Sequence, residues 1–129
     1  SKQLHSAVAN KDPRAMFYLG DMYIKGYGVI KNPKKGESLI LKAAKLGYGP
    51  AQLYIGRDFL YNKNNVSEAL VWLKKSATKG DVQAQLLCGS LYFYGHLVKK
   101  DLKSAEHWLK KAAEQGSVLA QFRLASLYH

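Results

Sequence analysis

The strongest constraint on this chain is an internal repeat. A six-residue motif with a small residue at each end occurs four times, and its leading alanines are 36, 33 and 36 residues apart. The four copies begin at Ala15, Ala51, Ala84 and Ala120. A second series, in which two small residues precede a glycine, keeps step with the first and ends at Gly47, Gly80 and Gly116. A fixed period of this size is typical of solenoids, whose units bury their apolar faces against their neighbours and which usually bind other molecules.

Each repeat predicts two helices joined by a loop. In residues 84–119, apolar side chains recur at the spacing of one helix face. That first helix carries Ala84, Leu87, Cys88, Leu91 and Tyr92 and is expected to end at Gly95. A second helix is expected from about residue 102 to residue 115, with an apolar stripe of Ala105, Trp108, Leu109 and Ala112. The predicted fold is therefore all-α and built of antiparallel helix pairs.

Small and bulky residues recur at fixed places in the repeat. Glycine stands inside the first helices at positions 20, 56 and 89, although it costs about 1 kcal/mol relative to alanine there. This recurrence predicts that a second helix approaches closely at each glycine. Leu39, Trp72 and Trp108 share one position in the second helices and are expected to be bulky core residues between units.

The repeats divide the chain as one domain over residues 1–129. We expect the end of a preceding repeat at 1–12, repeats at 13–48, 49–81 and 82–117, and the first helix of a further repeat at 118–129. Within 1–12, Ala7 and Val8 match the paired small residues, and Lys11 stands where the other units have glycine. The loop at 62–65 is three residues shorter than its counterparts, so its shape should differ. Neither end shows the polar cap usual for such arrays, which suggests a piece of a longer repeat protein.

These residues resemble the Sel-one-like repeat family, which is related to the tetratricopeptide repeats. The first half of the family pattern is matched by Ala15, Leu19, Gly20, Tyr23, Gly26, Gly28 and Val29, and the second half by Ala105, Trp108, Lys111, Ala112, Ala113 and Gly116. Departures include Leu39 for the usual tryptophan and Leu97 for a loop glycine. The resemblance implies a right-handed α/α superhelix that serves as a protein–protein adaptor, as part of a longer bacterial repeat protein.

The same resemblance implies a partner-binding groove, because the first helices line the concave face of such superhelices. Its expected residues follow the glycine of each first helix and are Asp21, Ile24, Lys25, Arg57, Leu60, Tyr61, Ser90, Phe93 and Tyr94. Arginine and aromatic side chains are frequent in binding hot spots. In this interpretation Lys25 and Arg57 bind a carboxylate of an acidic peptide. The alternative for Tyr61, Phe93 and Tyr94 is that they pack between adjacent helices.

The charge of the chain points to acidic partners. Its formal net charge is +11 and its pI is about 9.7. An excess of this size favours an acidic protein, a nucleic-acid backbone or an anionic membrane surface, although it also serves solubility. The second helices carry paired lysines: Lys42, Lys45, Lys74, Lys75, Lys110 and Lys111. The alternative function is thus an electrostatic binder of nucleic acid or anionic membrane, although such lysines also suit a solvated face and make nucleic acid the less favoured partner.

The sequence gives little support for catalysis or for metal or cofactor binding. His5, His96, His107 and His129 are scattered, without the spacing of metal ligands, and no catalytic triad or phosphate-binding loop stands out, so we expect no enzyme, cofactor or metal site. The single cysteine, Cys88, occupies an apolar repeat position and is expected to be buried and unreactive. No apolar run reaches the ~18 residues of a membrane span, and no signal peptide is visible. An exported (periplasmic or secreted) and a cytoplasmic location both stay open.

Overall fold

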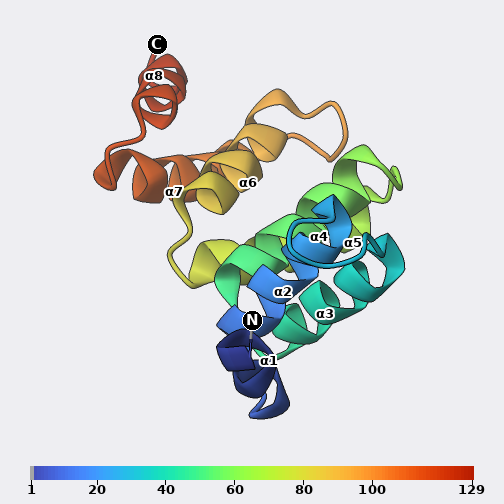
Figure 1. Ribbon diagram of the computed structural model, residues 1–129. Coiled ribbons are helices and arrows are strands. Elements are labelled where there is room, and N and C mark those ends of the chain that lie inside the picture. The colour runs from blue at the N-terminus through green and yellow to red at the C-terminus, as the bar shows by residue number, and fades with distance from the viewer. Residues whose placement is uncertain (1) are drawn as a thin grey trace. The chain divides into compact units, whose positions relative to one another are not determined.

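The computed structural model describes residues 2–129, and over that range it holds eight α-helices and no strand. Ser1, the first residue of the expected 1–12 segment, lies outside the described residues. In chain order the helices are α1 (Lys2–Ala9), α2 (Pro13–Lys25), α3 (Pro33–Lys45), α4 (Gly49–Tyr61), α5 (Val66–Thr78), α6 (Val82–Tyr94), α7 (Leu102–Glu114) and α8 (Val118–Leu127) (Figure 1). The predicted all-α class is confirmed, and the second helix expected at 102–115 is observed within one residue.

The chain forms two compact units, residues 1–55 and 56–129. In the first unit, α2 packs against α1 and against α3. In the second unit, α5 packs against α6, and α7 packs against both α6 and α8. The boundary falls inside α4, so the start of this helix belongs to the first unit and its end to the second.

Local signals fix where the helices begin and end. The carboxylate of Asp81 precedes α6 and accepts a hydrogen bond from the backbone N–H of Ala84 at 2.9 Å, which satisfies one of the helix's free donors. At the other end, Gly95 takes the left-handed conformation with φ 66°. The shortened loop after α4 has no glycine, and Asn64 takes the left-handed conformation there instead, with φ 51°. The expected change of loop shape is thus observed.

The glycines inside the first helices mark close helix contacts, as predicted. A Cβ atom added to Gly89 would lie 2.7 Å from Cγ of Leu109, and one added to Gly56 would lie 2.7 Å from Cγ of Leu73. In the first unit, a Cβ at Gly20 would lie 2.7 Å from the carbonyl oxygen of Gly36. These distances are shorter than carbon atoms tolerate, so each helix pair depends on the absence of a side chain.

A glutamine in the first turn of three first helices ties that helix to the preceding second helix. Each side-chain amide donates to the carbonyl oxygen of the residue eight positions earlier: Gln52 to Ala44 at 3.1 Å, Gln85 to Ala77 at 3.1 Å and Gln121 to Ala113 at 3.2 Å. We call this contact the junction bond. Sequence patterns did not indicate it, and Met16 occupies the same position in the first repeat.

The core of the second unit follows the predicted stripe. Ala105, Leu109, Ala112 and Ala120 are fully buried together. Cys88 is also fully buried, as its repeat position predicted. The shared bulky position is less uniform, because Trp72 is buried whereas Leu39 and Trp108 are only half-buried.

Candidate partner-binding surface

Polar and aromatic side chains from three helices gather on one face of the second unit. Arg57 and Tyr61 come from the end of α4, Ser90 and Tyr94 from α6, and Arg123 from α8. Each pair on a helix is four residues apart, which places both side chains on the same side of that helix. We call these five residues the two-arginine face.

The guanidinium group of Arg123 is held by α6. Its Nη1 donates to Oγ of Ser90 at 3.0 Å, and its Nε donates to the phenol oxygen of Tyr94 at 3.2 Å. Its central carbon also lies 5.3 Å from the centre of the Tyr94 ring, within the range of a cation–π contact. These contacts fix the orientation of the cation before any partner arrives.

A polar hollow of about 230 Å³ lies between the two arginines. Its lining residues are Arg57, Tyr61, Gln83, Leu86, Leu87, Ser90 and Arg123. Two of these side chains are cations and none is a carboxylate. An anionic group that enters the hollow therefore meets two guanidinium groups and no repelling charge.

An apolar hollow of about 180 Å³ adjoins the polar one and shares Leu87 and Ser90 with it. It is lined by Leu87, Ser90, Leu91, Tyr94, His96 and Leu97. The His96 ring stacks on Tyr94, with 9° between the ring planes and 6.3 Å between their centres. Leu97 is 59% exposed and stands where the repeat pattern has a loop glycine, so this departure supplies part of the apolar wall.

Four of the predicted groove residues are brought together here: Arg57, Tyr61, Ser90 and Tyr94. Leu60 was wrong as a groove residue, because it is only 5% exposed and belongs to the core. The turn of α4 that exposes Tyr61 directs the neighbouring Leu60 inward. Phe93 is half-buried against the core of α7 and α8, so it follows the alternative of packing between helices.

The other three predicted residues lie on α2 in the first unit. The ammonium group of Lys25 forms an ion pair with the carboxylate of Asp21 at 3.1 Å. Ile24 packs against α3, since a Cβ added to Gly36 would lie 2.7 Å from its Cγ1. The Lys25 charge is therefore already balanced by a neighbour on its own helix, whereas within residues 2–129 neither Arg57 nor Arg123 forms an ion pair.

The repeat pattern did not predict Arg123 as a residue of this face. This residue occupies the position held by Tyr18, Tyr54 and Leu87 in the other repeats. A cation at a position that elsewhere holds a large, largely apolar side chain was the available signal. Its contacts with α6 depend on how α8 packs, which no sequence spacing specifies.

The lysines of the second helices are exposed on α3, α5 and α7. Two of them contact rings of this chain: Lys74 lies 5.3 Å from the ring centre of Tyr92, and Lys75 lies 4.8 Å from that of Trp72.

Burial raises the pKa of the Cys88 thiol to about 12, although the nearby charge of Lys74 acts in the opposite direction. Across residues 2–129, no group of three or more histidine, cysteine or acidic residues is placed to hold a metal ion. No helix in that range is long and apolar enough to cross a membrane.

Comparisons with known proteins agree with this architecture. The Sel1 repeat family model matches residues 13–48, 50–81, 82–117 and 118–129. The structure is similar to that of a Sel1 repeat protein from Oxalobacter formigenes, with a TM-score of 0.90, 30% identity, and coverage of 97% of this chain and 96% of that one. It is also similar to a protective antigen of uropathogenic Escherichia coli with an SLR fold, at a TM-score of 0.80 and 30% identity. That match covers 98% of this chain and only 28% of the antigen.

A more distant structure shares the fold alone. The immunity protein Pa5087 from Pseudomonas aeruginosa matches with a TM-score of 0.52 and 22% identity, over 91% of this chain and 58% of that one. The family model covers most of the sequence, and its matches coincide with the repeat period, the helix pairs and the intrahelical glycines. The chain therefore belongs to the Sel1 repeat family.

Proposed function

We propose that this chain is an interaction module that binds an acidic peptide segment of a partner protein on the two-arginine face. Repeats of this family are generally protein–protein interaction modules and typically non-catalytic scaffolds. The observation that carries the proposal is the pair of guanidinium groups around a hollow without a carboxylate, beside an apolar hollow.

The two hollows suggest the chemistry of the peptide. An aspartate or glutamate side chain suits the space between Arg57 and Arg123, because guanidinium groups bind carboxylates with directed hydrogen bonds. A nearby leucine or phenylalanine of the same peptide suits the hollow walled by Leu91, Tyr94 and Leu97. Since the hollows share Leu87 and Ser90, the acidic and apolar residues of the peptide should be close in its sequence.

Arg123 is well suited to act as an anchor. Its side chain is fixed by Ser90 and Tyr94, so little conformational freedom is lost when a partner binds. Arg57 is exposed and can move to meet the bound carboxylate. The proposal thus assigns a fixed cation and an adaptable cation to one anionic group.

A peptide library tests this proposal. Fluorescent peptides that carry one acidic residue and one leucine or phenylalanine at different spacings are measured by anisotropy, with lysine-for-acid peptides as the comparison. We expect the acidic peptides to bind and the double variant Arg57→Glu/Arg123→Glu to lose at least about tenfold in affinity. The matched control Lys99→Glu/Lys110→Glu changes the net charge equally on residues outside both hollows.

The outcome is read from the difference between the two double variants. Equal losses in both would mean that only overall charge matters, and the assignment to this face would be wrong. Unchanged binding after Arg57→Glu with Tyr94→Ala, measured by pull-down of a partner captured from the native cell, would also contradict it. Circular dichroism of each variant confirms that the helices remain folded.

A further inference from the structure

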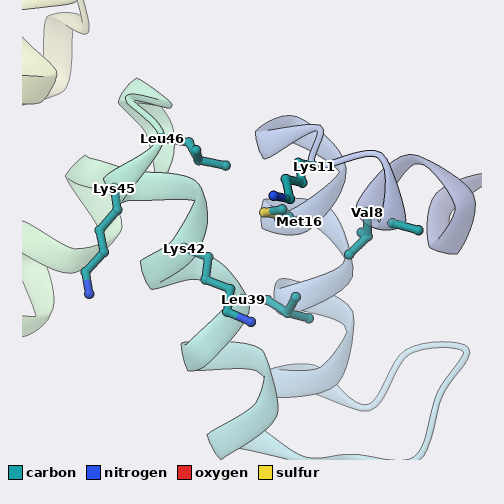
Figure 2. Close-up of a pocket in the computed structure, with 8 residues that line it drawn as sticks. Val8, Lys11, Met16, Leu39, Lys42, Lys45 and Leu46 are labelled. Carbon is teal, nitrogen blue, oxygen red and sulfur yellow. The ribbon is translucent and has the colours of Figure 1, made fainter.

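The first unit contains a pocket that is separate from the two hollows of the two-arginine face. It has a volume of about 480 Å³ and lies where the end of α1 meets α2 and α3 (Figure 2). Its apolar lining comes from Val8, Ala9, Met16, Leu39 and Leu46, and its charged lining comes from Lys11, Lys42 and Lys45. The volume is within the roughly 300–1,000 Å³ usual for small-molecule sites in proteins.

Three of the residues that line this pocket differ from the residues at the same positions in the other repeats. Met16 stands where the other repeats have the glutamine of the junction bond, so this bond is replaced by an apolar side chain. Leu39 stands where Trp72 and Trp108 stand in the later repeats, and its smaller side chain leaves space. Lys11 stands where the other turns have glycine. The pocket is therefore lined by substitutions that are specific to the first helix pair and to the turn before it.

Lys11 is held in an unfavourable backbone conformation. Its φ is 63°, in the left-handed region, whereas the equivalent turns use glycine, with φ 94° at Gly47 and 94° at Gly116. Residues with a Cβ atom rarely adopt the left-handed backbone conformation, and strain of this kind is concentrated at functional sites. A lysine at this turn brings an ammonium group to the pocket at a cost that glycine would avoid.

The charges at the pocket are all of one sign. Its lining has three lysines and no carboxylate. Figure 2 shows the ammonium group of Lys11 beside Met16 and that of Lys42 near Leu39, while the Lys45 side chain points away from the group. The floor is apolar, with Met16 only 6% exposed. An anionic head with an apolar tail matches this arrangement.

We propose that the pocket binds a small aliphatic carboxylate. The apolar chain lies against Met16, Leu39 and Leu46, and the carboxylate is bound by Lys11 and Lys42. Apolar contact and charge are both needed, because exposed lysines alone bind a carboxylate weakly. This site is distinct from the two-arginine face and shares no residue with it.

The two methionines of the chain provide a direct test. Met16 lines the pocket, whereas the methyl carbon of Met22 lies by Gly28, 3.3 Å from the position of an added Cβ. The protein is labelled with ¹³C at the methionine methyl groups, the Met16 and Met22 signals are assigned with Met22→Leu, and octanoate is titrated. We expect a saturable shift of the Met16 signal, an unmoved Met22 signal, and binding of neutral 1-octanol at least about threefold weaker. No saturable Met16 shift below roughly 10 mM octanoate, or equal shifts of both signals, would overturn the proposal.

Two variants separate binding from folding. Lys11→Gly restores the residue of the other turns, so we expect an unchanged or higher melting temperature together with at least about fivefold weaker octanoate binding. Asn64→Gly is the matched control, because it relieves the other left-handed non-glycine residue, at φ 51°, and should leave octanoate binding unchanged. Leu39→Trp should fill the pocket and abolish the Met16 shift. Unchanged octanoate affinity in Lys11→Gly and in Leu39→Trp would contradict the site.

Discussion

Arg123 on α8 donates a hydrogen bond to the hydroxyl group of Ser90 on α6 across 3.0 Å. The two residues are 33 positions apart, and the bond places a cation from one repeat on the surface of the previous one. The two-arginine face is thus assembled by neighbouring first helices, and the contacts between them determine where its charges lie.

The first prediction concerns this support of Arg123. Ser90→Ala with Tyr94→Phe removes both acceptors and keeps the aromatic ring. Because the guanidinium group would lose its fixed orientation, we expect acidic peptides from the library to bind about three- to tenfold more weakly, with little change in melting temperature. Fluorescence anisotropy measures the change. Ser126→Ala, which removes a hydroxyl that bonds within α8, is the control and should bind normally.

The second prediction concerns Gly89. A methyl group there would lie 2.7 Å from Cγ of Leu109 and 3.1 Å from its backbone nitrogen, so α6 and α7 would have to separate. We expect Gly89→Ala to lower the free energy of unfolding by about 1–3 kcal/mol, measured by urea denaturation. The double variant Gly89→Ala/Leu109→Ala should lose less than the sum of the single losses, because the smaller side chain makes room. Additive losses would mean that the two residues do not clash.

The third prediction concerns the thiol of Cys88. Its side chain is fully buried, and burial raises its pKa to about 12, so almost no thiolate exists at neutral or mildly alkaline pH. We expect no reaction with a disulfide reagent at pH 8 in the folded protein and full reaction in urea. A cysteine placed at the exposed position of Ser126 should react at once in the folded protein. Rapid labelling of native Cys88 would show that α6 opens readily.

The fourth prediction concerns the acid side of the stability profile. The hydroxyl and backbone N–H of Ser104 donate to the Asp101 carboxylate at 2.7 and 3.1 Å, and these bonds lower its pKa from the ordinary 3.8. A carboxyl group whose pKa is lower in the folded state stabilises the fold above pH 3.8, and this contribution disappears as the pH falls through the folded-state pKa.

Asp101→Asn keeps an acceptor for the start of α7 and removes the titration. We therefore expect the difference in stability between the wild type and this variant to be constant above about pH 5 and to change only below it. Urea denaturation at several pH values measures this difference. In Ser104→Ala, which removes the hydroxyl donor, the stability should fall less steeply at acid pH. A difference that varies between pH 6 and 8 would contradict the assignment.

The helices could be predicted because their signals are local. Apolar spacing and the glycine at position 95 predicted where α6 ends, and the glycine at position 116 marked the turn after α7. The close contact at Gly89 was also predictable, since a residue unfavourable in a helix recurred at the same place.

The residues of the two-arginine face could be predicted only in part, because the burial of a side chain depends on how neighbouring helices pack against it. Leu60 and Tyr61 are adjacent in sequence, yet one is in the core and the other is exposed. Arg123 was not recognised because its partners are on another helix, far away in the sequence. The pocket beside Met16 was not predicted for a similar reason. Lys11, Met16 and Leu39 each differ from their counterparts in the other repeats, but only the packing of α1, α2 and α3 brings them together.

The junction bond bears on how such proteins change length during evolution. Its donor and acceptor are eight residues apart on either side of one turn, as in Gln85 and Ala77. Duplication or deletion of one whole unit that carries the glutamine therefore places an equivalent carbonyl group eight residues before each glutamine, so every junction bond can form again. We expect gene segments of this kind to gain and lose whole units readily, whereas an insertion or deletion within a turn would change the eight-residue spacing and break the bond.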